Sequence, residues 1–219
     1  TTLRTNEGRF GGAVAVEEGT KNYIGNPSFE DGTFQGTGVW QATREITDKE
    51  SYHGKYSVKL TSHSGVGAGA LTFANMSVNV SGKPKGHTYT ASAYVKGKSG
   101  TVARVRVNIR GGTTGAIFKD AVITLTGEWQ RIVNTISLDT NDRQSIDMAV
   151  YVLGENNTIY IDGVQLEAKP FATSFVDGAR SGGNLVYDTR EIGITPEGDW
   201  SILGWYKKNA KQSVDNSWA

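Results

Sequence analysis

The chain has 219 residues, of which 37% are hydrophobic, 21% are charged and none is cysteine, a composition typical of a folded domain rather than of a disordered segment. The absence of cysteine excludes a disulfide framework, a thiolate metal site and a cysteine nucleophile. The formal net charge is only +1 and no apolar run approaches the roughly 18 residues of a membrane span, so we expect neither nucleic acid nor a membrane as a partner.

Short strands are predicted along most of the chain, because apolar and polar residues alternate with a period of two. In chain order the pattern predicts strands over Ser57–Thr61, Thr88–Lys96, Val102–Arg110, Ile123–Leu125, Arg131–Leu138, Ile146–Val152 and Ile159–Val164. Turn signals rich in glycine and asparagine separate these segments. Many short strands at this spacing indicate an antiparallel sandwich or barrel, so the predicted fold class is all-β.

The segment Val102–Arg110 shows the alternation most clearly. An apolar row at every second residue requires burial, which places Val105 and Val107 toward the core. Arg104, Arg106 and Asn108 must then face the opposite way. By the same argument Tyr94 and Tyr151 point outward from their own strands, and we expect them beside the arginines.

Several short motifs occur in an order that resembles a known group of domains. They are Asn26–Glu30 (NPSFE), Trp40, Ser51–Val58 (SYHGKYSV), Gly86–Ser92 (GHTYTAS), Glu128–Arg131 (EWQR) and Tyr160–Glu167 (YIDGVQLE). The set resembles the carbohydrate-binding modules around families 4, 9 and 22, which are galactose-binding-like jelly rolls. The resemblance implies a β-sandwich jelly roll over residues 23–176 that binds sugar without catalysis.

The flanking segments resemble those of such modules in bacteriophage and prophage virion proteins. Residues 1–22 form the lead-in, and residues 177–219 form a C-terminal extension with a short β-like aromatic segment, of which Asp199–Tyr206 resembles the opening strands of a concanavalin-like lectin domain. Aromatic clusters on short exposed segments usually mark interfaces. The resemblance of the flanks implies a virion or extracellular location. The aromatic residues of the extension predict contact with other virion subunits, with an exposed terminus as the alternative; they are Trp200, Trp205, Tyr206 and Trp218.

The resemblance also implies a structural calcium ion, for which proteins supply carboxylate and carbonyl oxygens. Carried over by motif, Glu30 and Asp162 would supply carboxylates, and Ser28, Ser51 and Gly54 would supply carbonyl oxygens. The alternative interpretation makes Glu30 and Asp162 ordinary turn and edge residues.

A sugar site requires an aromatic platform and planar polar groups. The candidate residues are Trp40, Tyr94, Arg104, Arg106, Asn108 and Tyr151. A solvated outer face is the alternative for the arginines. Core packing is the alternative for Trp40 and the favoured interpretation of Trp129. The row of arginines with aromatic neighbours is also compatible with single-stranded nucleic acid, but the balanced charge argues against it.

Catalysis is not expected, because the sequence contains no nucleophile elbow, P-loop or His-x-x-x-His pair. Nothing selects a glycosidase pair among Glu128, Asp147 and Asp162. Three hypotheses remain: a glycan-binding virion module, a structural virion protein without glycan binding, and a module from a secreted glycoside hydrolase. The lack of a linker rich in Pro, Ser and Thr favours a virion origin over the hydrolase.

Overall fold

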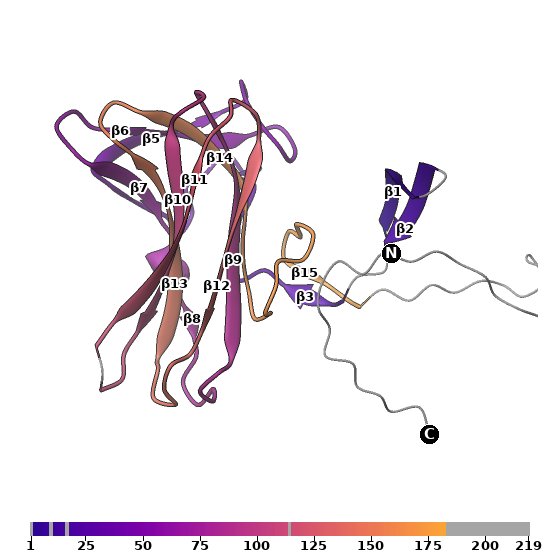
Figure 1. Cartoon of the computed structure of the whole chain (residues 1–219), viewed down its shortest axis with the longest axis vertical. Coiled ribbons are helices and arrows are strands. Elements are labelled where there is room, and N and C mark those ends of the chain that lie inside the picture. Colours follow the sequence, from indigo (N-terminus) through magenta and orange to yellow (C-terminus); the bar gives the residue numbers. More distant parts are fainter. Residues whose placement is uncertain (1, 9–10, 16–17, 114, 183–219) are drawn as a thin grey trace, which may run out of the picture. The chain divides into compact units, whose positions relative to one another are not determined.

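The computed structural model describes residues 2–8, 11–15, 18–113 and 115–182, and it divides into two units (Figure 1). One unit comprises residues 1–19 and 181–219; within it, β1 (Thr2–Gly8) and β2 (Gly11–Ala15) pair as an antiparallel hairpin. The other unit comprises residues 20–180. The predicted aromatic segment of the C-terminal extension lies outside the described residues.

The unit of residues 20–180 is built from two antiparallel sheets (Figure 1). The first, here called the β10 sheet, has the strand order β11 (Ile117–Thr124), β10 (Val102–Arg110), β13 (Ser145–Leu153), β7 (Ala68–Thr72) and β4 (Gly38–Trp40), with β8 (Val78–Asn79) also paired to β13. The second, here called the β9 sheet, has the strand order β12 (Gln130–Ser137), β9 (Thr88–Gly97), β14 (Thr158–Glu167), β6 (Ser57–Ser62) and β5 (Ala42–Thr47).

Two minor elements complete the unit. β3 (Thr20–Lys21) pairs with β15 (Ala179–Arg180), and this pairing joins the first and the last residues of the unit. Within the described residues the only helical element is η1 (Ala74–Met76), and none of the helices there is long and apolar enough to cross a membrane. The all-β sandwich predicted from the sequence is confirmed.

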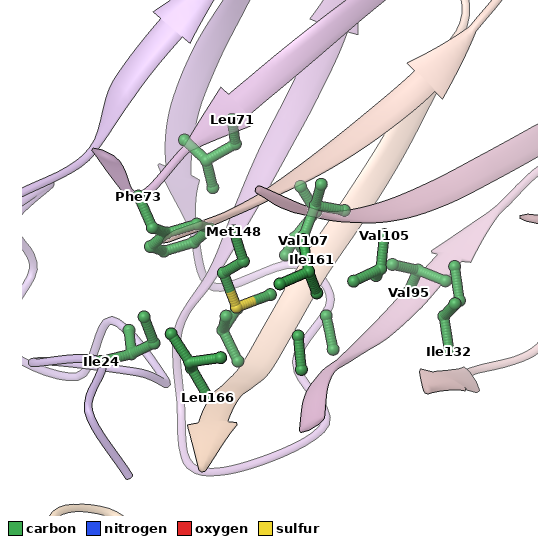
Figure 2. Close-up of a cluster of buried hydrophobic side chains, with 14 of the residues drawn as sticks. Ile24, Leu71, Phe73, Val95, Val105, Val107, Ile132, Met148, Ile161 and Leu166 are labelled. Carbon is green, nitrogen blue, oxygen red and sulfur yellow. The ribbon is translucent and has the colours of Figure 1, made fainter. Parts of the chain in front are cut away.

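The core lies between the two sheets (Figure 2). Val105 and Val107 are fully buried, as the alternation predicts. They belong to one buried cluster with side chains from both sheets, among them Leu71, Val95, Ile132, Met148, Ile161 and Leu166. Asn134 of β12 adds a polar tie across the core, because its amide donates to the carbonyl oxygens of Val105 (3.0 Å) and Lys119 (2.8 Å) in the opposite sheet.

Alternation located the long strands and missed the short ones. β10 has the predicted bounds, whereas β11 begins at Ile117, six residues before the predicted Ile123. β4, β5, β7 and β8 were not predicted. β7 gives no alternating pattern because its residues on both sides are apolar and buried: Leu71 faces the core, and the small Ala70 lies on the outer side between Trp40 and Tyr151.

Candidate functional site

The outer face of the β10 sheet gathers most of the predicted sugar-binding residues. Partners across a β-ladder point to the same side of the sheet. Arg104 pairs with Tyr151, Tyr151 with Ala70, and Ala70 with Trp40, while Val122 pairs with Arg104 on the other side. One row across five strands therefore carries Trp40, Tyr151 and Arg104 on a single face.

Two further rows run parallel to this one. In the second row Arg106 lies between Asp120 and Ala149, and in the third Asn108 lies between Phe118 and Asp147. We call the whole surface the arginine face, and define it by Trp40, Arg104, Arg106, Asn108, Arg110, Phe118, Asp120, Asp147 and Tyr151.

Aromatic rings support the arginines of this face. The guanidinium carbon of Arg104 lies 3.9 Å from the ring centroid of Tyr151, and that of Arg106 lies 3.9 Å from the ring centroid of Phe118. At this distance each cation is attracted to the face of the ring. Trp40 remains 50% exposed and Phe118 60% exposed, so the face offers accessible aromatic surface at both edges.

Two carboxylates bind the arginines from within the face. Asp120 accepts a bidentate pair from Arg106, with Nε–Oδ1 at 2.7 Å and Nη2–Oδ2 at 2.8 Å. This hydrogen bonding lowers the pKa of Asp120, although burial acts in the opposite direction. Asp147 accepts from Asn108 (2.7 Å) and from Nε of Arg110 (2.6 Å). Each carboxylate thus bridges donors that point out from β10.

Tyr94 does not belong to the arginine face, so that part of the prediction was wrong. It lies on β9, in register with Arg131 and Asp162, and therefore on the outside of the other sheet. Its ring stacks on Tyr52, with centroids 3.8 Å apart and an interplanar angle of 18°. The outward sides of two packed sheets point in opposite directions, and alternation along one strand does not say to which sheet that strand belongs.

Trp129 also departs from its predicted place in the core. It is only partly buried, and its ring centroid lies 5.9 Å from that of Tyr52. Trp129 directly precedes β12, so it joins the aromatic residues outside the β9 sheet. Its ring therefore lies beside Tyr52 and does not belong to the buried core cluster.

The predicted calcium ligand Asp162 is completely buried within β14. Its Oδ2 accepts hydrogen bonds from the amides of Tyr52 (2.6 Å) and His53 (2.8 Å), and its Oδ1 accepts one from Gly163 (2.6 Å). Gly163 has a φ of 52° at an irregularity of the ladder, where β14 changes register against β9. Burial raises the pKa of Asp162 to about 6; the amide hydrogen bonds oppose the shift and the charge of Glu30 adds to it.

The second predicted carboxylate, Glu30, reaches the same loop. It accepts hydrogen bonds from the amides of Lys55 (2.9 Å to Oε1) and Tyr56 (2.8 Å). A Cβ on Gly54 would lie 2.4 Å from the carboxyl carbon of Glu30, and Gly54 has a φ of 71°. The structure thus brings Glu30, Gly54 and Asp162 into one region, as the motifs predict.

The neutral donors predicted for calcium lie in the same segments. The hydroxyl of Ser51 donates to the carbonyl of Gly54 (3.1 Å), and Ser28 is buried two residues before Glu30. Within the described part of the chain no group of three or more His, Asp or Glu side chains is arranged for a metal. A cation here would therefore depend on two carboxylates and on carbonyl oxygens, a donor set that suits a hard ion such as calcium.

Asp120 and Phe118, which pair with the arginines, were not among the residues predicted for the site. The alternation of Phe118, Asp120 and Val122 along β11 is the sequence pattern that could have indicated that these residues share one face. Asp147, a sequence candidate for a catalytic pair with Asp162, lies on the other sheet from it, so the two carboxylates do not form such a pair.

The architecture and this surface define a class of protein: β-sandwich modules in which one sheet face presents aromatic rings beside planar polar groups. The sequence profile of the carbohydrate binding domain CBM_4_9 matches residues 21–157. The chain belongs to this family. No curated protein matches the chain by sequence.

Solved structures share the fold at low sequence identity. The enzymatically active domain of tailspike protein 4 of bacteriophage CBA120 has a TM-score of 0.52 at 12% identity, over 66% of this chain and 21% of the tailspike chain. The tandem CBM22 domains of Paenibacillus barcinonensis Xyn10C have a TM-score of 0.50 at 15% identity, over 68% of this chain and 50% of theirs.

A single module from a second bacterium is similar in size as well as in fold. The C-terminal family 22 module of Clostridium thermocellum Xyn10B has a TM-score of 0.50 at 14% identity, over 70% of this chain and 94% of the module. The chain thus matches nearly the whole of this module, but only a fifth of the tailspike domain and half of the tandem.

Proposed function

We propose that residues 20–180 form a non-catalytic module that binds a polysaccharide or a cell-surface glycan through the arginine face. The observation that carries this proposal is the row that places Trp40, Tyr151 and Arg104 on one side of the β10 sheet, with the small Ala70 between Trp40 and Tyr151. Aromatic rings can stack on the apolar face of a pyranose, and guanidinium and amide groups can bind its hydroxyls. Membership of the carbohydrate binding domain family supports the same function.

Binding by this open face should be weak. Hydroxyl contacts on an accessible sheet replace contacts with water, so each adds little net free energy. We expect dissociation constants in roughly the micromolar-to-millimolar range for a single site.

Asp120 of the arginine face supports a binding role over hydrolysis. A glycosidase needs a protonated carboxylic acid with a raised pKa beside a second carboxylate. Asp120 shows the opposite, since its hydrogen bonds from Arg106 lower its pKa. Incubation with the bound polysaccharide should therefore release no shorter products.

Affinity electrophoresis and calorimetry on a polysaccharide panel test the proposal. Trp40→Ala and Tyr151→Ala should each weaken binding at least tenfold while the melting temperature changes little. Tyr52→Ala is the matched control, because Tyr52 is similarly exposed (46%) but stacks outside the β9 sheet. A protein that retains no polysaccharide on the panel, or a control that loses binding equally, would refute the site.

A structural virion protein without glycan binding is the second candidate. It is favoured by the internal pairing of the face, where Asp120 and Asp147 already satisfy much of the hydrogen bonding of Arg106, Asn108 and Arg110. A completely negative glycan panel with an intact fold would decide for this candidate.

Calcium is proposed as a structural ion held by Glu30 and Asp162, with carbonyl oxygens of Ser28, Ser51 and Gly54. The support is the convergence of two carboxylates on one loop and the burial of Asp162. Bound there, the ion would supply charge neutralisation and would hold β14 to the loop of residues 51–56. Chelation should lower the melting temperature of the wild type.

A virion or extracellular location is proposed from the flanking residues. The segments around Gly8–Asn22 and Gly178–Arg180 support a virion protein, in which the aromatic residues of the C-terminal extension would contact other virion subunits. A secreted glycoside hydrolase is the alternative source of such a module. Mass spectrometry of purified particles, with the neighbouring genes, separates these origins.

A further inference from the structure

The strands of the arginine face carry an uncompensated positive charge. Their outward positions include three arginines, Arg104, Arg106 and Arg110, and two acids, Asp120 and Asp147. The net charge of these positions is +1, the same as that of the whole chain. The excess charge therefore lies among the aromatic rings that would bind a sugar chain.

Arg104 is the least compensated of the three arginines. Its Nη1 lies 3.4 Å from Oδ2 of Asp120, an oxygen that already accepts from Arg106 at 2.8 Å. Its Nε has no hydrogen-bond partner among the described residues, but this atom is buried. A ligand would have to reach the rest of the guanidinium, since the side chain as a whole is 18% exposed. Arg106 and Arg110, in contrast, each have a carboxylate oxygen within 2.7 Å. A ligand that brings an acceptor to Arg104 would complete what Asp120 supplies only in part.

The position of Arg104 suits recognition of a charged sugar. Its guanidinium carbon lies over the ring of Tyr151, and its row continues through the small side chain of Ala70 to the exposed Trp40. Three strand spacings separate Trp40 from Arg104, roughly 14 Å, which accommodates more than one sugar ring. A guanidinium binds a carboxylate more strongly than it binds a neutral hydroxyl, because the charged pair forms shorter bonds in a matching planar geometry.

We infer that the arginine face selects acidic polysaccharides, in which carboxylate-bearing sugars such as uronic acids meet Arg104 while neighbouring rings stack on Tyr151 and Trp40. Arg104 is then the residue that determines specificity. This inference rests on the proposed function of the same face.

The test compares an acidic polymer with its neutral methyl ester. Polygalacturonate and its methyl-esterified form share a backbone, but the ester has no free carboxylate. The full chain should bind polygalacturonate at least tenfold more tightly than the ester at low ionic strength, and the difference should shrink as salt is added. This comparison requires no variant.

Two variants locate the effect. Arg104→Gln, which keeps a planar polar group without charge, should reduce the preference to within about twofold, chiefly by weakening the binding of polygalacturonate. Arg104→Lys, which keeps a point charge, should retain a part of the preference. Lys59→Gln is the control, because it removes one positive charge from the β9 sheet, where Lys59 pairs with Glu45 across the ladder.

The outcomes distinguish a failure of this inference from a failure of the proposed glycan-binding function. Equal binding of the acid and the ester would overturn the inference and leave the glycan-binding function intact. Loss of the preference in Lys59→Gln as large as in Arg104→Gln would also overturn it, since the effect would then come from overall charge. Binding to neither these polymers nor a neutral panel would refute the proposed function itself.

Discussion

Replacing Asp162 by asparagine should change how the stability of the fold depends on pH. The folded state raises the pKa of Asp162 from 3.8 to about 6, so between these values the folded state binds more protons than the unfolded chain. The contribution of Asp162 to the free energy of unfolding is therefore fully present below about pH 4 and is lost as the pH rises through about 6.

The size of the effect follows from the two pKa values. Between about pH 7.5 and pH 5 the shift corresponds to about 1.4 kcal/mol of additional stability at the lower pH. For a unit of this size, that free energy raises the melting temperature by about 3 to 6 °C. Asparagine does not titrate in this range, so the corresponding part of the pH dependence should disappear in Asp162→Asn.

The assay is thermal unfolding in chelator, followed by circular dichroism for both proteins at both pH values. Burial lowers the pKa of His53, which makes the protein less stable toward acid, but His53 is present in both proteins. The difference between them therefore isolates Asp162. Asp177→Asn, at an exposed carboxylate, serves as the control and should follow the wild type.

Calcium should reverse the pH dependence of stability in the wild type, because the ion binds the ionised carboxylate and therefore stabilises the protein more at the higher pH. A hundredfold excess over the dissociation constant would stabilise the protein by about 2.7 kcal/mol at neutral pH, and by less near pH 5. Asp162→Asn should lose this response. The reasoning fails if wild type and Asp162→Asn show the same pH dependence in chelator, and the metal site fails if calcium does not shift the melting temperature of the wild type.

Three further substitutions have definite expected outcomes. Gly54→Ala should destabilise the fold by more than Gly65→Ala, measured by chemical denaturation. Both glycines have a similar positive φ, but only at Gly54 would the new Cβ approach Glu30, at 2.4 Å from its carboxyl carbon. Equal losses of stability would show that the close approach is relieved at no cost. Tyr94→Ala should lower the melting temperature and leave glycan affinity unchanged, since the ring stacks outside the β9 sheet; a selective loss of affinity would contradict this placement. Asn134→Leu should cost about 1 to 3 kcal/mol, measured by urea unfolding, because it removes two buried hydrogen bonds between the sheets; an unchanged midpoint would show that these bonds add no net stability.

Much of the fold could be predicted from local pattern alone. Alternation depends only on the period of a strand, so it identified β10 residue by residue and correctly placed Val107 inside and Arg106 outside. The short motifs likewise indicated the family. They also indicated that Glu30 and Asp162 lie close together, because residues that form a particular turn, or accept hydrogen bonds from particular backbone amides, occur in recognisable local motifs. β7 left no such pattern, because burial on both sides removes the alternation.

The composition of the candidate site was decided by tertiary structure. Tyr94 and Tyr151 both point outward from their strands, yet they lie on opposite sides of the sandwich, because strand order and not sequence distance determines which sheet a strand joins. For the same reason Asp120 becomes the partner of Arg106 only when β11 pairs with β10. The local sequence determines which way each side chain faces along its own strand. The pairing of strands decides which side chains meet, because these contacts form between segments that are far apart in the sequence and whose local patterns do not indicate their partners.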